Sequence, residues 1–368
     1  MKDSDGHAAS RLSRLLVALA VAMVVVVGVT ACGSSSSSSS SSGGGESAGG
    51  GGSAEGGEGE SSLAAAGGER DKTIFLINPF DANPWAKAYA EAFIPALEAK
   101  GVKVTRLTNE FDPVKESEEF DQAISENPGA IATFAADGKA VVPSIKRAEA
   151  AGIPVFNLTA NIDPAAKSAL ASNIISNAKE LGSKAGELLV EGLEEAGFKE
   201  GNILALTGVA TQSVVIEQMA ALEEVLAKTP QYKIVETQDT QWDQAKAETL
   251  ASQAFAKYAN QGGIQGVFGS NDANVAGAIQ AGKKLGLKFG GKEGIVAVGA
   301  ACFPVGYENI AAGLQYGSVS EFPKEEGANS AELIAKWFNG ESIPANVELE
   351  EKTVDKENLE STGKGCQF

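Results

Sequence analysis

Residues 73–93 read TIFLINPFDANPWAKAYAEAF, and the hydrophobic period of this stretch changes part-way along it. The first five residues form an almost wholly apolar run, of the kind found in a strand buried on both faces. From Trp85 onward, aromatic side chains recur at every fourth position, at Tyr89 and Phe93, which is typical of one face of a helix. The stretch therefore predicts a buried strand that leads through a short turn into a helix.

The same alternation of strand-like and helix-like segments continues along the chain. Further strand-like runs occur at 102–107, 130–134, 153–158, 202–208, 232–238, 264–270 and 294–299. Amphipathic segments occur at 84–100, 114–126, 138–151, 175–196, 212–228, 243–260 and 272–287. This order is typical of an α/β protein with parallel sheets covered by helices on both faces. Because so many strand–helix units exceed one small sheet, we expect two Rossmann-like lobes that divide near Ser172–Asn173, with the segment around a helix at 323–338 crossing back between them.

The start of the chain has the composition of an export signal. Residues 1–31 combine a basic start with an apolar run at 15–29, which is shorter than the roughly 20 residues of a membrane-spanning helix. The small residues that end in Cys32 resemble the lipobox of bacterial lipoproteins, and this resemblance implies cleavage before Cys32 and attachment of lipid to it. An uncleaved membrane anchor is the alternative. In both cases we expect the rest of the chain outside the cytoplasmic membrane.

Residues 32–70 predict a disordered tether. They are rich in Ser and Gly, and Ser34–Ser42 is an unbroken run of serine. Such a composition cannot bury enough apolar surface to fold. The folded region is therefore expected to begin near residue 71.

Composition excludes several classes of function. The chain has a formal net charge of −18, which disfavours nucleic acid as a partner. The one histidine is His7, inside the predicted signal, so a histidine base, nucleophile pair or metal ligand is not available to the mature protein. No arginine follows Arg147, so the C-terminal half lacks the usual partner of phosphate or carboxylate ligands. We expect no catalytic residue, no metal and no cofactor.

Cys302 and Cys366 are the two cysteines besides Cys32. In an exported protein an even pair suggests a disulfide, which here would hold the C-terminal tail. Two buried free thiols are the alternative.

Acids, amides and aromatic side chains follow several of the predicted strands. In parallel sheets the carboxyl ends of the strands meet at one edge, where ligands bind. Carboxylates and amides hydrogen-bond hydroxyl groups, and aromatic faces cover the C–H side of a sugar-like ring. The pattern favours recognition of a neutral, polyhydroxylated molecule, although acceptors beside aromatic faces also suit a small cation. The side chains concerned are Asn83, Trp85, Phe134, Asp137, Trp242, Asp243, Asn271, Asp272 and Glu321.

Ordinary structural roles compete with this interpretation. Asn83 before Pro84 is a good start for a helix, and Asp137, Asp243 and Asp272 also suit helix N-termini. Trp85 could open the core stripe that continues at Tyr89. Two tryptophans at two such turns are harder to explain by capping, and this favours a binding site.

The exported start, the two-lobe pattern and three motifs together resemble a known family. The motifs are NPW at 83–85, WD at 242–243 and SNDANVAGA at 270–278. They resemble the periplasmic sugar-binding proteins of ABC importers, in the ribose-binding-like branch of type I. The resemblance implies a Venus-flytrap protein whose lobes are joined by a three-strand hinge and close on a sugar. It implies an N-terminal lobe of 71–173 plus 322–350 and a C-terminal lobe of 174–321 plus 351–368.

The resemblance also assigns ligand contacts and shows where this chain departs from the family. It adds Gln218 to the candidate residues above, sets Glu321 at the hinge, and makes Asp243 a weaker candidate than its neighbour Trp242. Where the family often has Asp-Arg, this chain has Thr159-Ala160, and Ala301 stands in place of an acid. The clamp that relatives use on ring hydroxyls is therefore absent, which argues against ribose and leaves another sugar, a linear polyol or a different hydroxylated molecule.

We therefore expect a lipid-anchored, monomeric solute-binding component of an ABC importer, whose partners are a small sugar or polyol, the membrane and an ABC permease. The alternatives are a receptor domain that senses the same ligand, a binder of a cationic solute, and a glycan hydrolase with Asp243 and Asp272 as its carboxylate pair.

Overall fold

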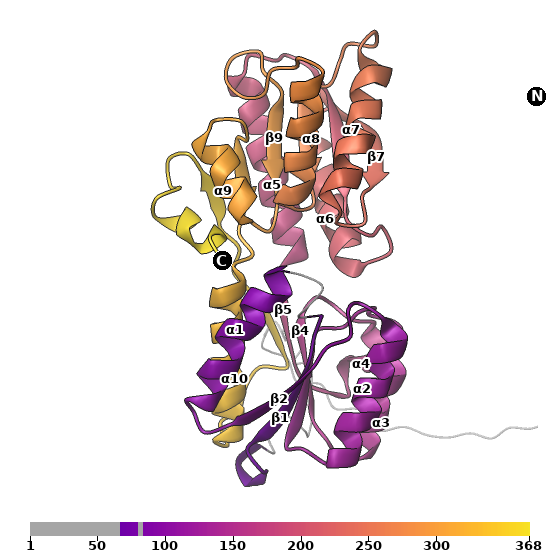
Figure 1. Cartoon of the computed structure of the whole chain (residues 1–368), viewed down its shortest axis with the longest axis vertical. Coiled ribbons are helices and arrows are strands. Elements are labelled where there is room, and N and C mark those ends of the chain that lie inside the picture. Colours follow the sequence, from indigo (N-terminus) through magenta and orange to yellow (C-terminus); the bar gives the residue numbers. More distant parts are fainter. Residues whose placement is uncertain (1–66, 80–83) are drawn as a thin grey trace, which may run out of the picture. The chain divides into compact units, whose positions relative to one another are not determined.

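The computed structural model describes residues 67–79 and 84–368, which contain two six-stranded sheets. All neighbouring strands of the first sheet run parallel. Helices cover both of its faces: α1 (Pro84–Glu98) and α10 (Pro323–Phe338) lie on one side, and α2 (Pro113–Glu126), α3 (Val142–Ala150) and α4 (Pro164–Lys167) on the other (Figure 1). The strand order is β11 (Asn346–Leu349), β5 (Leu170–Ser176), β4 (Val155–Thr159), β3 (Ala130–Thr133), β1 (Thr73–Ile77) and β2 (Lys103–Leu107).

The second sheet has the same construction. Its core packs α5 (Ala178–Glu195) and α6 (Ser213–Leu226) on one face, and α7 (Gln244–Tyr258) and α8 (Asp272–Lys284) on the other. The strands are parallel except that the first in the order pairs antiparallel with the second. Their order is β12 (Thr353–Asp355), β10 (Gly317–Val319), β9 (Val296–Gly299), β8 (Gly266–Gly269), β6 (Gly201–Thr207) and β7 (Tyr232–Asp239).

The chain passes three times between the two sheets. It leaves the first sheet after β5, returns after β10 into α10, and crosses again between β11 and β12. The predicted α/β fold with two parallel-sheet lobes and a three-strand hinge is confirmed. We call the sheet that contains β1 the first lobe and the sheet that contains β6 the second lobe.

Strand β5 was not among the strand-like runs recognised in the sequence, which placed a lobe boundary near Ser172–Asn173. Its seven residues are all buried although three are polar. The Asn173 side chain accepts a hydrogen bond from Asn157 at 2.6 Å and donates to Asn346 at 2.7 Å. These neighbours form hydrogen bonds with the Asn173 amide inside the sheet, which offsets the cost of burying it. The polar residues of this segment are the reason that the sequence did not indicate a strand. The chain leaves this sheet after Ser176.

The first described residues lie within the predicted tether. Residues Gly67–Glu69 form a 3₁₀ helix, η1, against the end of α10, and a Cβ atom at Gly67 would stand 1.9 Å from the Trp337 carbonyl oxygen. Arg70 donates a hydrogen bond to the Gly152 carbonyl at 3.0 Å. Residues 67–70 are thus part of the first lobe. The predicted signal, Cys32 and the tether up to residue 66 lie outside the described residues. No helix within 67–79 and 84–368 is long and apolar enough to cross a membrane.

A disulfide joins Cys302 to Cys366. Both cysteines are fully buried in a small apolar cluster with Ile310, Phe322 and Val354, next to α9 (Pro304–Ala311) and the C-terminal 3₁₀ helix η2 (Thr362–Cys366). The bond links the C-terminal tail to the second lobe. Of the two alternatives from the sequence, a disulfide or two buried free thiols, the structure has the disulfide.

We predict that the double variant Cys302→Ala/Cys366→Ala loses about 2–4 kcal/mol of unfolding free energy, because a cross-link between residues 64 apart no longer restricts the unfolded chain. Urea unfolding followed by circular dichroism measures the loss. Reductant should destabilise the original protein and leave the double variant unchanged; equal sensitivity of both would contradict the assignment.

Candidate functional site

A cavity of about 660 Å³ is lined by residues of both lobes. Most of its walls come from the carboxyl ends of the parallel strands, the loops that follow them and the N-terminal turns of the next helices, as expected for an α/β sheet. Phe134 and Asp137 follow β3, and Thr159 is the last residue of β4. Trp242 comes after β7, and Asn271 after β8. The site is therefore assembled from turns that are far apart in the sequence.

Strained backbone collects around this cavity. Eight non-glycine residues of the described chain have positive φ, and four of them line the cavity: Phe111, Thr159, Trp242 and Ala301. A left-handed conformation is costly for a β-branched residue such as Thr159, whose φ is 71°. Such strain persists where the surrounding structure holds it, most often at ligand sites.

Trp85 is both a core residue and a wall of the cavity. It is only 5% exposed, stacks on Tyr89 with ring centroids 5.5 Å apart, and still lines the cavity. Its indole Nε1 donates a hydrogen bond to the Glu321 carbonyl at 2.7 Å. The two alternatives from the sequence, a core residue or a wall of the cavity, are thus both met by Trp85. The indole plane is fixed from behind by the core and at its edge by the hinge.

Phe134 and Asp137 stand on the same side of the cavity as Trp85. The Phe134 ring meets Trp85 edge-on at 5.9 Å and Phe111 edge-on at 5.8 Å. Asp137 Oδ1 accepts hydrogen bonds from the backbone N–H groups of Lys139 at 2.9 Å and Ala140 at 2.8 Å. The carboxylate of Asp137 therefore caps its own turn while it lines the cavity.

Trp242 is the aromatic wall contributed by the second lobe. It is half-buried and lies so close to Gly208 that a Cβ atom there would be 2.1 Å from the indole. Its Nε1 donates to Gln212 Oε1 at 2.8 Å. Gln212, which the sequence did not single out, thus orients this ring.

Gln218 and Asn271 form a buried part of the lining. Gln218 is 1% exposed, and its Nε2 is 3.5 Å from the Ser270 carbonyl oxygen. Asn271 caps α8 by accepting a hydrogen bond from the Asn274 N–H at 2.9 Å. Both residues face the cavity, so capping again coexists with a place in the site.

Asp243 and Asp272 do not line the cavity. Asp243 is exposed and caps α7, accepting a hydrogen bond from the Lys246 N–H at 2.6 Å. Asp272 is fully buried within the second lobe. Three donors converge on its carboxylate, which accepts from the Phe303 N–H at 2.7 Å, Gln315 Nε2 at 2.6 Å and Ser318 Oγ at 2.9 Å. Burial raises the pKa of Asp272 to about 7, and these hydrogen bonds oppose the rise. Both acids therefore hydrogen-bond groups of the protein itself, Asp243 as an exposed cap and Asp272 inside the second lobe.

Glu321 lies where the hinge meets the cavity. It follows β10 on the segment that leads into α10, and it lines the cavity. Burial raises the pKa of its carboxyl to about 7, and a hydrogen bond with Ser176 lowers it.

Asn83, the remaining candidate, lies outside the described residues. Two features of the site had no signal in the sequence. Asn161 Nδ2 donates to both carboxylate oxygens of Glu217, at 3.1 and 3.2 Å, and Ser213 Oγ donates to the Asn161 carbonyl at 2.7 Å. These hydrogen bonds join the loop after β4 in the first lobe to α6 in the second. Three lysines, Lys139, Lys167 and Lys179, also reach the rim of the cavity.

The site and the fold together define a two-lobed binding protein with its ligand space between the lobes. Residues 74–342 match the family model of the periplasmic binding protein domain. The chain therefore belongs to this family, whose members are binding components and not enzymes.

Named relatives span most of the chain. It is 27% identical over 301 residues to the fructose import binding protein FruE of Bifidobacterium longum, a match that covers 79% of this chain and 87% of that protein. It is 23% identical to the ribose import binding protein RbsB of Escherichia coli, with 81% and 95% covered. Among solved structures, the arabinose-binding component from Shewanella sp. ANA-3, with bound L-arabinofuranose, superposes with a TM-score of 0.72 at 22% identity, covering 80% of this chain and 95% of that one. At this identity the superposition supports the fold.

We predict that Asp272→Ala lowers the unfolding free energy by more than about 2 kcal/mol, because three buried donors lose their acceptor. Urea unfolding measures this. Asp243→Ala, which removes only an exposed cap, should cost about 1 kcal/mol. If the two variants were equally stable, the structural role of Asp272 would be wrong.

Proposed function

We propose that this protein is the exported solute-binding component of an ABC importer and that it binds a small neutral carbohydrate or sugar alcohol in the cavity between its lobes. Membership of the periplasmic binding protein family supports the binding role. The named relatives are import binding proteins for sugars, which favours delivery to a membrane permease over sensing of the ligand.

One observation carries the chemistry of the ligand. Thr159 Oγ1, Gln218 Oε1 and Ser270 Oγ are buried atoms that find no hydrogen-bond partner among the described residues. All three residues line the cavity, Thr159 from the first lobe and the other two from the second. A buried polar atom without a partner costs about 1–3 kcal/mol, so such atoms are rare unless a water or ligand completes them. A hydroxyl group can donate to the amide oxygen and exchange hydrogen bonds with both side-chain hydroxyls.

The charges around the cavity favour a ligand without a net charge. Its lining includes no arginine, the residue best suited to bind carboxylate or phosphate. The lysines at its rim, Lys139, Lys167 and Lys179, are exposed, whereas the partnerless atoms of Thr159, Gln218 and Ser270 are uncharged and buried. The deep contacts therefore suit hydroxyl groups better than an anion, and the five acids of the lining can also accept hydrogen bonds from hydroxyl groups.

The aromatic walls suit the apolar side of a sugar or polyol. Trp85 and Trp242 come from different lobes, and each indole N–H is already occupied by a protein acceptor, Glu321 O or Gln212 Oε1. These hydrogen bonds, together with the stacking of Trp85 on Tyr89, set the orientation of both rings in advance, and the ring surface that lines the cavity can contact a ligand. We propose that closure holds the ligand between these two rings.

The hydrolase alternative loses its basis, since neither Asp243 nor Asp272 lines the cavity. Their positions support capping and internal hydrogen bonding instead of acid–base chemistry at a ligand.

The ligand class is tested by thermal shift with pentoses, hexoses and sugar alcohols, alongside glucuronate, glucosamine and spermidine. We expect at least one neutral compound to raise the melting temperature by several degrees at a hundredfold excess over its Kd. The charged compounds should not do so. Stabilisation by glucuronate or spermidine alone would reject the neutral-ligand proposal.

The site residues are tested with the neutral compound found in that screen. Trp242→Ala, Gln218→Ala and Thr159→Ala should each weaken binding at least about tenfold by calorimetry, because each removes a direct ligand contact. Asp243→Ala is the matched control, being next to Trp242 in the chain but outside the cavity, and should bind like the original protein. Unchanged affinity in all three cavity variants would move the site elsewhere.

We also propose that Cys32 carries a lipid that anchors the exported protein to the outer face of the cytoplasmic membrane, with residues 33–66 as its tether. The lipobox-like sequence before Cys32 supports this. Expressed in a bacterial host, the original protein should partition with membranes and into detergent, whereas Cys32→Ala should not be lipidated. Recovery of both from the aqueous phase would exclude the anchor.

A further inference from the structure

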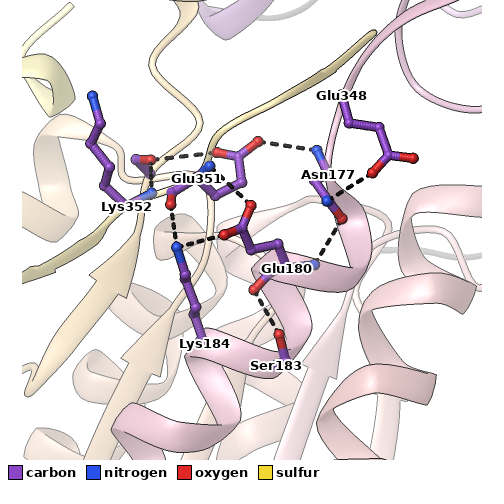
Figure 2. Close-up of polar contacts among 8 residues, drawn as sticks. Asn177, Glu180, Ser183, Lys184, Glu348, Glu351 and Lys352 are labelled. Carbon is purple, nitrogen blue, oxygen red and sulfur yellow. Dashed lines mark hydrogen bonds and ion pairs between the residues drawn. The ribbon is translucent and has the colours of Figure 1, made fainter. Parts of the chain in front are cut away.

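Buried carboxyl groups meet where the three hinge segments cross. Glu351 stands on the segment between β11 and β12, Glu326 on α10, and Glu321 on the segment before α10. Figure 2 shows Glu351 beside Glu180 and Lys184 of α5 and beside Asn177, at the exit from β5. Residues of both lobes and of all three crossings thus surround one set of acids.

Glu351 is held by groups from each neighbouring segment. Its carboxyl accepts hydrogen bonds from the Asn177 N–H at 3.1 Å and from Ser320 Oγ at 3.4 Å, and its own N–H donates to Glu180 Oε2 at 3.2 Å. The side chain is 1% exposed. These contacts span β5, β10 and α5, so the position of Glu351 depends on how the three crossings pack together.

Glu326 is the least satisfied member of the set. It is 5% exposed, and its Oε2 accepts a hydrogen bond from Ser176 Oγ at 2.8 Å. Its Oε1 is buried and finds no partner among the described residues. An ionised carboxylate in this position would be costly, whereas a neutral carboxyl group is tolerated.

The cations near the hinge are directed at other acids. Lys184 Nζ lies 2.6 Å from Glu180 and donates to the Glu351 backbone carbonyl, and Lys352 pairs with the exposed Glu325 at 3.4 Å. None of the ion pairs formed within 67–79 and 84–368 involves Glu326 or Glu351. The charged or titratable groups that face these two acids are Glu321, Glu325, Glu180, Lys184, Lys352 and Tyr89 of α1.

We propose that the hinge holds protons on Glu326 and Glu351 when its three segments are packed as in this structure, and that opening of the lobes releases them. Opening would admit water to the crossings and separate the acids, and both changes favour ionisation. Closing would take the protons up again. The packed hinge is therefore favoured by low pH, and the lobes open more readily as the pH rises.

The shifted pKa values agree with this geometry. Burial and, second, the neighbouring Glu321 raise the pKa of Glu351 to about 9, against the lowering effect of its hydrogen bonds with Asn177 and Ser320. Burial also raises the pKa of Glu326 well above its usual range, with Glu321 and Glu351 adding to the rise. A carboxyl whose pKa is higher in the packed state binds more protons there. Its stabilising contribution is complete below the pKa of the solvated group and is lost as the pH rises through the raised value.

The experiment uses the protein without ligand, so its outcome does not depend on the proposed sugar. Small-angle X-ray scattering and thermal unfolding are recorded from pH 5 to pH 9. We expect the radius of gyration of the original protein to increase with pH and its melting temperature to fall. Glu326→Gln and Glu351→Gln each remove one of the two acids, so in each variant the radius should increase less with pH and the melting temperature between pH 6 and 9 should fall by at least about 3 °C less.

Two matched controls are available on the same segments. Glu332→Gln on α10 and Glu350→Gln next to Glu351 change exposed glutamates and should keep the pH response of the original protein. Infrared spectroscopy at pH 7 gives a second measurement: a protonated carboxyl band should be present in the original protein and weaker in Glu326→Gln and Glu351→Gln, because Asp272 and Glu321 also contribute to it. Absence of that band, or an unaltered pH response in both Gln variants, would overturn the proposal.

Discussion

Parallel pairing of the strands is the constraint on which the rest of this structure depends. A parallel strand cannot be followed by its neighbour through a tight turn, so the chain must return over a face of the sheet, here mostly through a helix. The carboxyl ends of the strands in each sheet therefore gather at one edge, together with the N-termini of the following helices. Both edges contribute to one cavity. The residues that line the cavity are consequently close in sequence to strand ends, but they are far apart in sequence from one another although they meet in space.

Capping a helix or turn and lining the cavity are not exclusive at such an edge. Asn271 caps α8 and Asp137 caps its own turn, and both line the cavity. Asp243 performs the same capping chemistry but faces outward, and Asp272 spends its acceptors on donors inside the lobe. The four residues look alike in sequence because each follows a strand. They differ in whether the side chain faces the cavity, and the capping role does not determine this direction.

The hinge adds a second kind of constraint. Three segments of the chain must cross between the lobes, and packing them together removes Glu326 and Glu351 from water. Burial and the neighbouring acids favour neutral carboxyl groups over two adjacent negative charges, although the hydrogen bonds from Asn177, Ser176 and Ser320 oppose this. Glu321 belongs to this set and also lines the cavity, so the ligand space and the hinge share one residue. Proton binding and lobe closure are thereby linked through the same packing.

The sequence by itself determined the α/β class, the two lobes and most helix starts, because hydrophobic period and cap residues are local signals. It also identified Trp85 and Trp242 as unusual at turns, and family resemblance pointed to Gln218. It missed β5, whose buried Asn173 finds its hydrogen-bond partners Asn157 and Asn346 on the neighbouring strands of the folded sheet. Only the tertiary structure decided that Asp243 and Asp272 lie outside the cavity lining and that hinge acids distant in sequence come together. It also decided that Thr159 and Ser270 line the cavity with side-chain oxygens that find no partner among the described residues. These are properties of side-chain direction and long-range packing, which no local pattern encodes.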